Sequence, residues 1–389
     1  PRQVGKTTYL KLIIRELLAK GIDSKRFFYL SCEPFKNFEE IIEIVRFSDT
    51  LIKGEKYFFF DEITFIKDWQ RAIKYILDSE LKNKKTFYIS GSSTIALKKE
   101  TFPGRDIKIK EFLPLSFREF CQIFVSENLK NTLNKIKLNS LEVSEVYKKA
   151  KQVFFFSKEI SSLFADYMQT GGFPRSIYEL IEGNGIKEET YEIYWKWLVS
   201  DIAKIDRSER ITRSVLISVL KNYSSKFSLN SIAKEMEIGS HVTIREYLEI
   251  LENLFVLRNV FPFDFAKKTE CFRKMRKIYF TDPFLFSVYK KTLTKQQITD
   301  DEIPKIIEGI VSEHLIRKFG KVFYASNGKE IDFILNKTAI EVKWRAKTSF
   351  KDFGKITLKN NILLSKSNFD FKEKDKILII PASLFLTLI

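Results

Sequence analysis

The sequence predicts an α/β fold, because short apolar strands alternate with helical segments over residues 1–117. Three runs have the length and the aromatic content of buried strands, namely residues 27–30, 57–60 and 86–90. Each run ends beside polar residues, which is where open α/β sheets bind ligands. Apolar residues at helical spacing over residues 9–18 predict a first helix, and Gly21 is the expected stop.

The first eight residues fit most of a phosphate-binding loop, Gly-x-x-x-x-Gly-Lys-Ser/Thr. Gly5 lets the backbone approach a phosphate, while Lys6 would reach the β- and γ-phosphates. The Thr7 hydroxyl would bind Mg²⁺, and Thr8 belongs to the same cradle of backbone N–H groups. The alternative interpretation is a basic N-terminal tail that leads into a helix.

The leading Gly of this pattern would lie before Pro1, and so would the strand that usually precedes the loop. We therefore expect the nucleotide site of this chain to be recognisable in its architecture but weakened or empty.

A second nucleotide motif follows the aromatic run 57–60. Asp61 would hold Mg²⁺ directly or through water, and Glu62 would orient and polarise the attacking water. Ser92 or Ser93 would contact the γ-phosphate or that water, although both could be plain turn residues. Two acids that cap the end of a strand are the alternative for Asp61 and Glu62. Their position after Gly5-Lys6-Thr7 favours an ATP and Mg²⁺ site.

An arginine could complete the site by acting on the γ-phosphate, in cis or on a neighbouring subunit of a homo-oligomer. Arg105, which follows a Phe-Pro-Gly turn, is the first candidate. Arg175 and Arg210 are further candidates, and a surface arginine beside a turn is the alternative for each.

The sequence resembles the AAA-type ATPases of archaea and bacteria that carry a C-terminal region named domain of unknown function 4143. The residues that carry the resemblance are Asp61-Glu62-Ile63, Asp68-Trp69, Ser90-Gly91-Ser92-Ser93, Gly104-Arg105, Leu113-Pro114-Leu115-Ser116-Phe117-Arg118-Glu119-Phe120 and Gly171-Gly172-Phe173-Pro174-Arg175. The resemblance implies an ATP-binding core, a helical region, a winged helix and a tail that resembles restriction endonucleases. It implies no particular substrate.

The net charge of +17 indicates an acidic partner, and nucleic acid is the first to consider. The 3 cysteines form no CxxC pair, which argues against a zinc site or disulfide framework and fits a reducing cytoplasm. No apolar run is long enough to span a bilayer, so no membrane partner is expected.

Helical spacing over residues 118–215 predicts an all-helical region, and residues 216–295 fit a winged helix. Its second helix would begin after Ser240, and residues 256–263 and 277–280 would form the wing. That helix offers His241, Thr243 and Arg245 for base or phosphate contacts, but also three glutamates. Between Phe265 and Lys295 there are nine Lys or Arg and two acids, a balance of +7 that suits a DNA backbone. A protein-binding winged helix is the alternative.

Residues 296–389 carry a second possible active site on a hairpin that turns at Asn336-Lys337. This register pairs Asp332 with Glu341 and places Lys343 on the same face as Glu341. With Glu308 on the preceding helix, or Glu313 in its place, these acids could hold Mg²⁺ while Lys343 orients or deprotonates water, as in restriction-endonuclease-like nucleases. A polar sheet face with a stabilising lysine is the alternative.

Three functions therefore compete. The first is a Mg²⁺-dependent AAA-type ATPase coupled to DNA or a partner through the winged helix. The second is an ATP-gated metal-dependent DNA nuclease, and the third is a non-catalytic DNA- or protein-binding switch.

Overall fold

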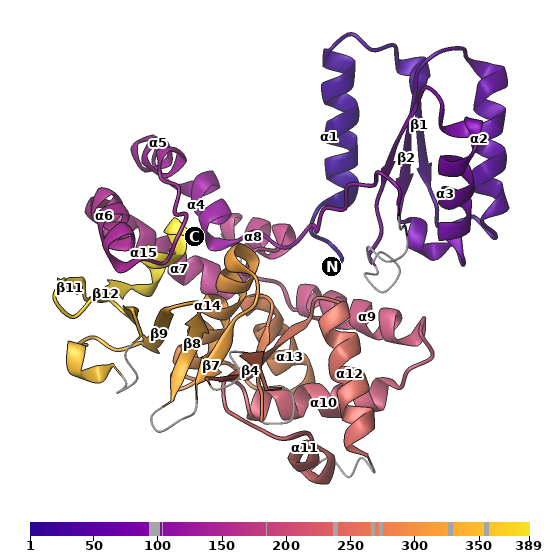
Figure 1. Cartoon of the computed structure of the whole chain (residues 1–389). Helices are drawn as coiled ribbons and strands as arrows, with labels where there is room; N and C mark the ends of the chain where they lie inside the picture. Colours follow the sequence, from indigo (N-terminus) through magenta and orange to yellow (C-terminus); the bar gives the residue numbers. More distant parts are fainter. Residues whose placement is uncertain are drawn as a thin grey trace. The chain divides into compact units, whose positions relative to one another are not determined.

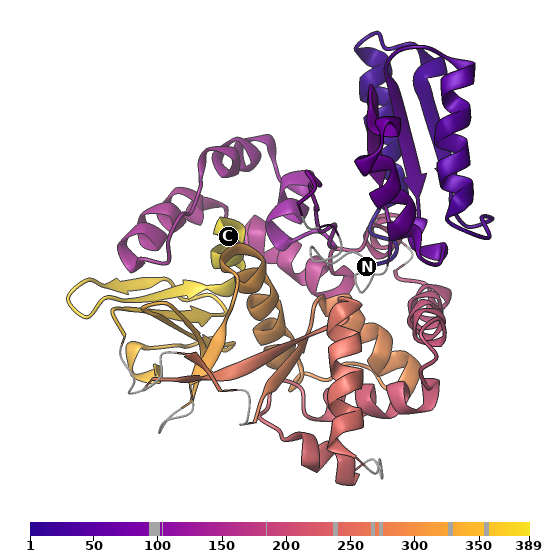
Figure 2. The same ribbon diagram turned by 45° about the vertical axis from the view of Figure 1, so that its right-hand side comes forward.

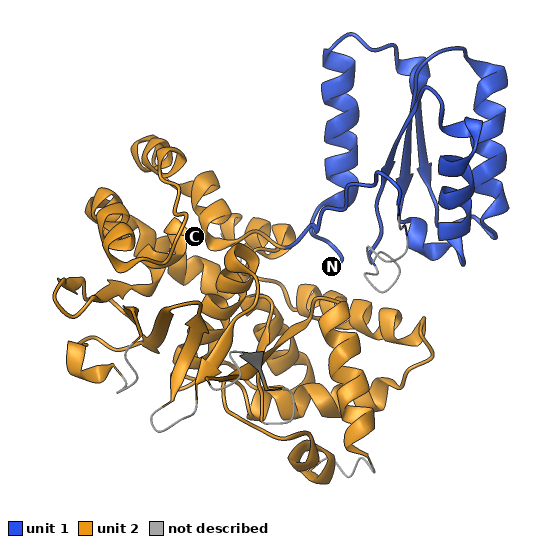
Figure 3. Cartoon of the chain, in the orientation of Figure 1, with its two compact units in different colours: residues 1–113 blue, residues 114–389 orange. Residues whose placement is uncertain are grey.

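The structure is a computed structural model that describes residues 1–92, 102, 104–183, 185–235, 240–265, 269–271, 275–325, 330–353 and 358–389. The chain forms two compact units, residues 1–113 and residues 114–389 (Figure 3). The expected turn at Gly239, Ser93 and four of the nine basic residues between positions 265 and 295 lie outside the described residues.

The first unit is a parallel three-stranded sheet in the order β1-β2-β3, with α1 on one side and α2 and α3 on the other (Figure 1). Its main elements are α1 (Lys6–Ala19), β1 (Phe27–Ser31), α2 (Glu39–Leu51), β2 (Lys56–Asp61), α3 (Trp69–Asp78) and β3 (Lys85–Ile89). The three expected strands and the first helix are confirmed. Gly21 ends α1 with a φ of 84°, and the Ile22 N–H bonds back to the Leu17 carbonyl.

Aromatic side chains fill the core of this sheet because equivalent positions on the three strands are in register. Phe58 pairs with Phe28 on one side and with Phe87 on the other, and their ring centroids lie 4.9 and 5.3 Å from that of Phe58. Helices α2 and α3 cover this face with apolar residues such as Val45 and Ile73. This packing fixes the carboxyl end of β2, which carries Asp61.

The second unit contains the remaining helices, and the helical spacing over 118–215 corresponds to α4 to α10. Its helices are α4 (Phe117–Phe124), α5 (Glu127–Lys135), α6 (Val143–Val153), α7 (Ser157–Thr170), α8 (Pro174–Ile181), α9 (Glu188–Ala203), α10 (Glu209–Lys221), α11 (Leu229–Glu235), α12 (His241–Asn253), α13 (Pro283–Thr294), α14 (Ile303–Phe319) and α15 (Ala382–Leu388). Helix α12 begins as expected, because the Ser240 hydroxyl accepts a hydrogen bond from the Val242 N–H. None of the helices in the described part of the chain is both long and apolar enough to span a bilayer.

A mixed sheet of nine described strands runs through the second unit (Figure 2). Its strands are β4 (Leu257–Asp264), β5 (Thr269–Glu270), β6 (Lys277–Phe280), β7 (Phe323–Ala325), β8 (Ile331–Leu335), β9 (Thr338–Lys343), β10 (Asn360–Ser365), β11 (Asp370–Lys372) and β12 (Ile377–Pro381). The order is β11-β12-β10-β9-β8-β7-β4-β5, and β6 pairs with β4.

Strand β4 connects the two parts of this sheet. It pairs antiparallel with β6, the second of the two expected wing strands, and parallel with β7 of the expected nuclease-like region. The hairpin β8–β9 has the expected register, since Leu335 faces Thr338 and Phe333 faces Ile340. The wing and the hairpin are therefore held in one continuous sheet.

The Gly171-Gly172 pair lets three segments of the second unit pack closely against one another. Gly172 accepts a hydrogen bond from the Leu115 N–H (2.9 Å), and a Cβ on Gly172 would lie 2.0 Å from the Leu115 carbonyl oxygen. A Cβ on Gly171 would lie 1.7 Å from Oδ1 of Asp282. Two of the segments that carry the family resemblance, residues 113–120 and 171–175, therefore touch directly and leave no room for a side chain.

Asp282 gives this junction a pH dependence. Its carboxylate accepts hydrogen bonds from the Gly172 and Phe284 N–H groups, at 2.9 and 2.8 Å, but burial outweighs them and raises its pKa to about 7. A raised folded-state pKa contributes stability below about pH 4 that is lost as the pH rises through about 7. As the pH rises over this range, the free energy of unfolding should fall less in Asp282→Asn than in the wild type. Urea denaturation at a series of pH values measures both. The same change of unfolding free energy with pH in both proteins would contradict this expectation.

Candidate functional site

The predicted phosphate-binding loop ends at the N-terminus of α1. Gly5 is the N-cap of the helix in the left-handed region, with φ 94°, which a residue with a side chain adopts only with strain. The Lys6 ammonium bends back over the loop and donates to the carbonyl oxygen of Pro1 at 2.5 Å. The side chains of Thr7 and Thr8 follow in the first turn, and both are exposed. This loop therefore presents helix N–H groups and a lysine on the same side, as an anion-binding loop requires.

Asp61, at the end of β2, lies directly beside this loop. Its Oδ2 accepts hydrogen bonds from the Thr7 and Tyr29 hydroxyls, both at 2.7 Å, and its Oδ1 accepts one from Ser90 at 2.5 Å. Burial alone would raise the pKa of Asp61, but these three hydroxyls outweigh it and the pKa is lowered. Asp61 is therefore a carboxylate at neutral pH.

Glu62 occupies a strained backbone position next to Asp61. Its φ is 55°, in the left-handed region that residues other than glycine seldom adopt. Its Oε1 lies 3.7 Å from the Lys6 Nζ, while its Oε2 accepts a hydrogen bond from the Ser92 N–H at 3.1 Å. The sheet thus brings together Lys6, Thr7, Asp61, Glu62 and Ser92.

This arrangement suits a magnesium nucleotide. Mg²⁺ prefers hard oxygen ligands and usually takes only one or two from the protein, the rest being phosphates and water. The Thr7 hydroxyl and the Asp61 carboxylate are such ligands and already contact each other. Asp61 therefore fits the role predicted for it, and Glu62 stands on the same edge of the sheet.

Two of the three candidate arginines, Arg105 and Arg175, bind other partners in the structure, and Arg210 is exposed at the start of α10. Arg105 forms an ion pair with Asp78 at the end of α3, with an Nε–Oδ1 distance of 3.0 Å. Arg175 bonds through Nε to Glu179 (3.2 Å) and to Thr190 (3.0 Å). Arg105 is thus held by an acid of its own unit, and Arg175 by partners within residues 114–389.

The predicted nuclease residues lie in the second unit, and a lysine stands between them. Lys277, from β6, is 1% exposed and places its Nζ 2.9 Å from Glu308, 3.3 Å from Asp332 and 2.6 Å from Glu330. Burial alone would lower the pKa of Lys277, but the carboxylates of Glu308, Asp332 and Glu330 raise it above its usual value. The position between Glu308 and Asp332 is therefore filled by an ammonium group.

Two findings bear on the expectations for this site. Over the described ranges, no group of three or more His, Cys, Asp or Glu side chains is arranged to hold a metal ion, so Glu308, Asp332 and Glu341 form no such group. Lys343 pairs with Glu341 at 2.6 Å, which offsets the effect of burial and raises the pKa of Lys343. Lys343 is therefore an ammonium that could orient water but not deprotonate it. The substitute Glu313 pairs with Arg258 and Arg317.

The basic wing also differs from its expectation. Lys277 turns into the protein instead of facing a phosphate backbone, and Arg276 is also buried. Lys290, Lys291 and Lys295 are engaged in ion pairs with glutamates. The nine basic residues therefore offer less free charge than the sequence count indicates.

Sequence reasoning gave no role in these clusters to three of their residues: Tyr29, Ser90 and Lys277. Ser90 could have been inferred, since it is the last residue of the predicted strand that neighbours Asp61. Tyr29 lies inside an aromatic run, where its hydroxyl gave no separate signal.

A comparison with protein families finds a match that covers the first unit. Residues 1–121 match the family described as an AAA domain. This range contains the loop, β2 and the strand-end residues described above. Residues 161–296 match a domain of unknown function numbered 8612, in place of the 4143 that the sequence resemblance implied.

Two curated relatives align with most of the chain. An uncharacterized protein of Haemophilus influenzae is 25% identical, and the match covers 86% of this chain and 78% of that protein. An uncharacterized protein of Methanocaldococcus jannaschii is also 25% identical, over 90% of this chain and 75% of the relative. The similarity to these bacterial and archaeal proteins thus extends over both units of the chain.

Solved structures give only remote likenesses. The RuvB Holliday junction branch migration motor of Thermotoga maritima is 14% identical, with a TM-score of 0.26, over 67% of this chain and 80% of RuvB. Cdc6p of Pyrobaculum aerophilum is 14% identical, with a TM-score of 0.26, over 76% of this chain and 86% of Cdc6p. Such scores carry no argument about the function of this chain.

Proposed function

We propose that this protein is a Mg²⁺-dependent ATPase whose N-terminal AAA domain binds and hydrolyses ATP. The observation that carries the proposal is the contact between Thr7 and Asp61 beside the Lys6 ammonium and Glu62. These four side chains come from the loop and from the end of β2, where parallel sheets bind ligands. The match of residues 1–121 to an AAA domain supports the same activity.

Each residue has a separate role in this proposal. The N–H groups at the start of α1 and Lys6 would bind the phosphates, and Thr7 and Asp61 would hold Mg²⁺, which neutralises charge on the phosphates. Glu62 would orient and polarise the attacking water, and Ser92 would contact the γ-phosphate or this water. Arg105 could reach a nucleotide only after it leaves Asp78, in cis or on a neighbouring copy in a homo-oligomer.

Two substitutions separate binding from hydrolysis. Lys6→Ala should abolish ATP binding and turnover, because it removes the cation that reaches the phosphates. Glu62→Gln should keep binding but lower turnover about 10²- to 10⁴-fold, since it removes the group that activates water. Binding is measured with a fluorescent ATP analogue, and turnover by phosphate release with Mg²⁺.

Lys11→Ala is the matched control, because Lys11 is an exposed lysine on the same helix. It should leave binding and turnover unchanged. Turnover that persists in Lys6→Ala would show that the proposed site is wrong.

We further propose that nucleotide state is coupled to DNA through the winged helix formed by α11, α12 and the pair β4–β6. The net charge of +17 supports a DNA partner, and so does the exposed Arg245 on α12. In this proposal residues 1–117, 118–215, 216–295 and 296–389 are functional parts, although residues 114–389 form one compact unit.

The nuclease alternative has weaker support. Its hairpin and its four residues are present, but Lys277 lies between Glu308 and Asp332. The non-catalytic switch would bind DNA in a salt-sensitive manner and hydrolyse no ATP. The turnover measurement on the wild type distinguishes this switch from the ATPase.

A further inference from the structure

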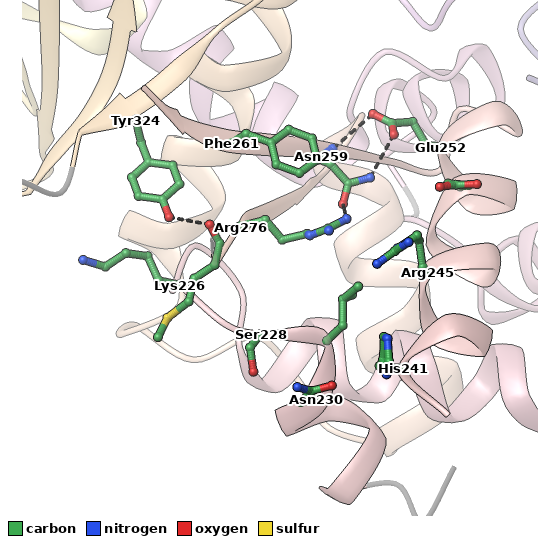
Figure 4. Close-up of a pocket in the computed structure, with 13 residues that line it drawn as sticks. Lys226, Ser228, Asn230, His241, Arg245, Glu252, Asn259, Phe261, Arg276 and Tyr324 are labelled. Atoms are coloured by element: carbon green, nitrogen blue, oxygen red, sulfur yellow. Dashed lines mark hydrogen bonds between the residues drawn. The ribbon is translucent and has the colours of Figure 1, made fainter. Parts of the chain in front are cut away.

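A large open cavity lies in the second unit beside α12, and no predicted active site accounts for it (Figure 4). Its volume is about 1240 Å³. Its walls come from α11, α12, the strand β4, Tyr324 of β7 and the residues just before β6. Four basic side chains line it: Lys226, His241, Arg245 and Arg276.

Arg276 is the unusual member of this lining, because it is only 8% exposed. Its guanidinium lies 4.8 Å from the centroid of the Phe261 ring and donates a long bond of 3.5 Å to the Asn259 side-chain oxygen. Among the described residues, no carboxylate forms an ion pair with it. A buried charge without a direct ion-pair partner is costly, so an anion bound here would offset part of that cost.

The other buried basic side chains that the structure describes have carboxylate partners, unlike Arg276. Within the described ranges, Lys56, Arg276 and Lys277 are the ones that are less than 9% exposed. Lys56 pairs with Asp49 at 2.7 Å, and Lys277 has three carboxylates within 3.3 Å. Arg276 is next to Lys277 in sequence yet points to the opposite side, where the cavity is.

A second guanidinium faces the same space. Figure 4 shows Arg245 and Arg276 pointing toward one another across the cavity. Arg245 has no ion pair with any residue that the structure describes, and burial and Arg245 together lower the pKa of Arg276. Of the two lining glutamates, Glu252 is bound by the N–H and side-chain amide of Asn259. Glu249 is exposed, and within the described ranges it forms no ion pair with either arginine, although the carboxylates of Glu252 and Glu249 offset part of the lowering of the Arg276 pKa.

We propose that this cavity is a phosphate-binding site in which Arg276 and Arg245 bind the oxygens of one phosphate group. Paired guanidinium groups match the geometry of phosphate oxygens and form charge-assisted hydrogen bonds with them. The assignment of this phosphate to the backbone of DNA rests on the proposed function. The anion site itself does not, and inorganic phosphate is the alternative source of the same chemistry.

The test compares three full-length proteins. Arg245→Gln removes an exposed guanidinium from the cavity, and Lys234→Gln is the matched control, because Lys234 is exposed on α11 and does not line the cavity. DNA affinity is measured by anisotropy of a labelled duplex at several salt concentrations. Thermal unfolding is measured with inorganic phosphate and with chloride at equal ionic strength.

We expect Arg245→Gln to weaken DNA binding about tenfold, which corresponds to the loss of one charge-assisted hydrogen bond. The slope of log affinity against log salt should fall by about one, and Lys234→Gln should change both quantities clearly less. Phosphate should raise the unfolding temperature of the wild type but not of Arg245→Gln. Arg276→Gln should reproduce these effects if it folds, but Arg245→Gln decides the test, because an exposed residue can be replaced without disturbing the core.

The outcomes separate the two levels of the proposal. If the wild type binds DNA and both variants weaken it equally, the cavity is not the phosphate site, while DNA binding stands. If the wild type binds no DNA but phosphate stabilises it in an Arg245-dependent manner, the anion site is supported and the DNA part of the proposed function fails. If neither DNA nor phosphate has an effect, both are overturned.

Discussion

Replacement of Lys277 by methionine should lower the free energy of unfolding of the second unit by about 3–5 kcal/mol. The variant keeps much of the side-chain volume but leaves Glu308, Glu330 and Asp332 close together without the ammonium that offsets their repulsion. Urea denaturation followed by tryptophan fluorescence measures this loss, because Trp195, Trp197 and Trp344 lie in the second unit and Trp69 in the first.

Lys372→Met is the matched control for this substitution. Lys372 lies in the same sheet but pairs with Asp375 on the surface, so its loss should cost about 0–1 kcal/mol. Mg²⁺ should recover part of the stability of Lys277→Met and none in the wild type, since a cation could then replace the ammonium group. Equal costs for the two variants would show that Lys277 does not hold the carboxylates together.

Gly172→Ala should cost about 3 kcal/mol, because the added Cβ has no space. It would lie 2.0 Å from the carbonyl oxygen and 2.3 Å from the nitrogen of Leu115, and both are backbone atoms that cannot turn away. The hydrogen bond from the Leu115 N–H to Gly172 would also break. The unfolding midpoint in urea and hydrogen exchange at Leu115 both report the effect.

Gly183→Ala provides the comparison for Gly172→Ala. Gly183 has φ 82° and no atom within 4 Å of a built Cβ, so its substitution costs only the backbone strain of about 1 kcal/mol. A Gly172→Ala variant as stable as Gly183→Ala would mean that residues 113–120 and 171–175 do not pack as described.

The residues around Asp61 could be selected from the sequence because they lie in short, local motifs. Gly5, Lys6 and Thr7 are consecutive, Asp61 and Glu62 end an obvious strand, and parallel strands place their carboxyl ends on one edge. The three hydroxyls on Asp61 come from three different elements, and only the fold determines that they meet.

The second unit was predicted less well, because its contacts join residues that lie far apart in the sequence. The hairpin register follows from its two-residue turn, so Leu335 and Thr338 were placed correctly. Lys277 was counted with the basic residues of the wing, because nothing near position 277 in the sequence indicates that β6 lies against Glu308 and Asp332. A charge count does not separate a buried lysine from an exposed one. It therefore overstated the basic surface of the wing.

Arg276 and Lys277 also restrict how this segment can vary in length. Consecutive residues in an extended chain point to opposite faces, so a one-residue shift of this segment against β4 would turn each cation to the other face. The guanidinium would then leave the cavity face, and the ammonium would leave the three carboxylates. We expect natural variation in this stretch to preserve its residue count, whatever changes occur in the side chains around it.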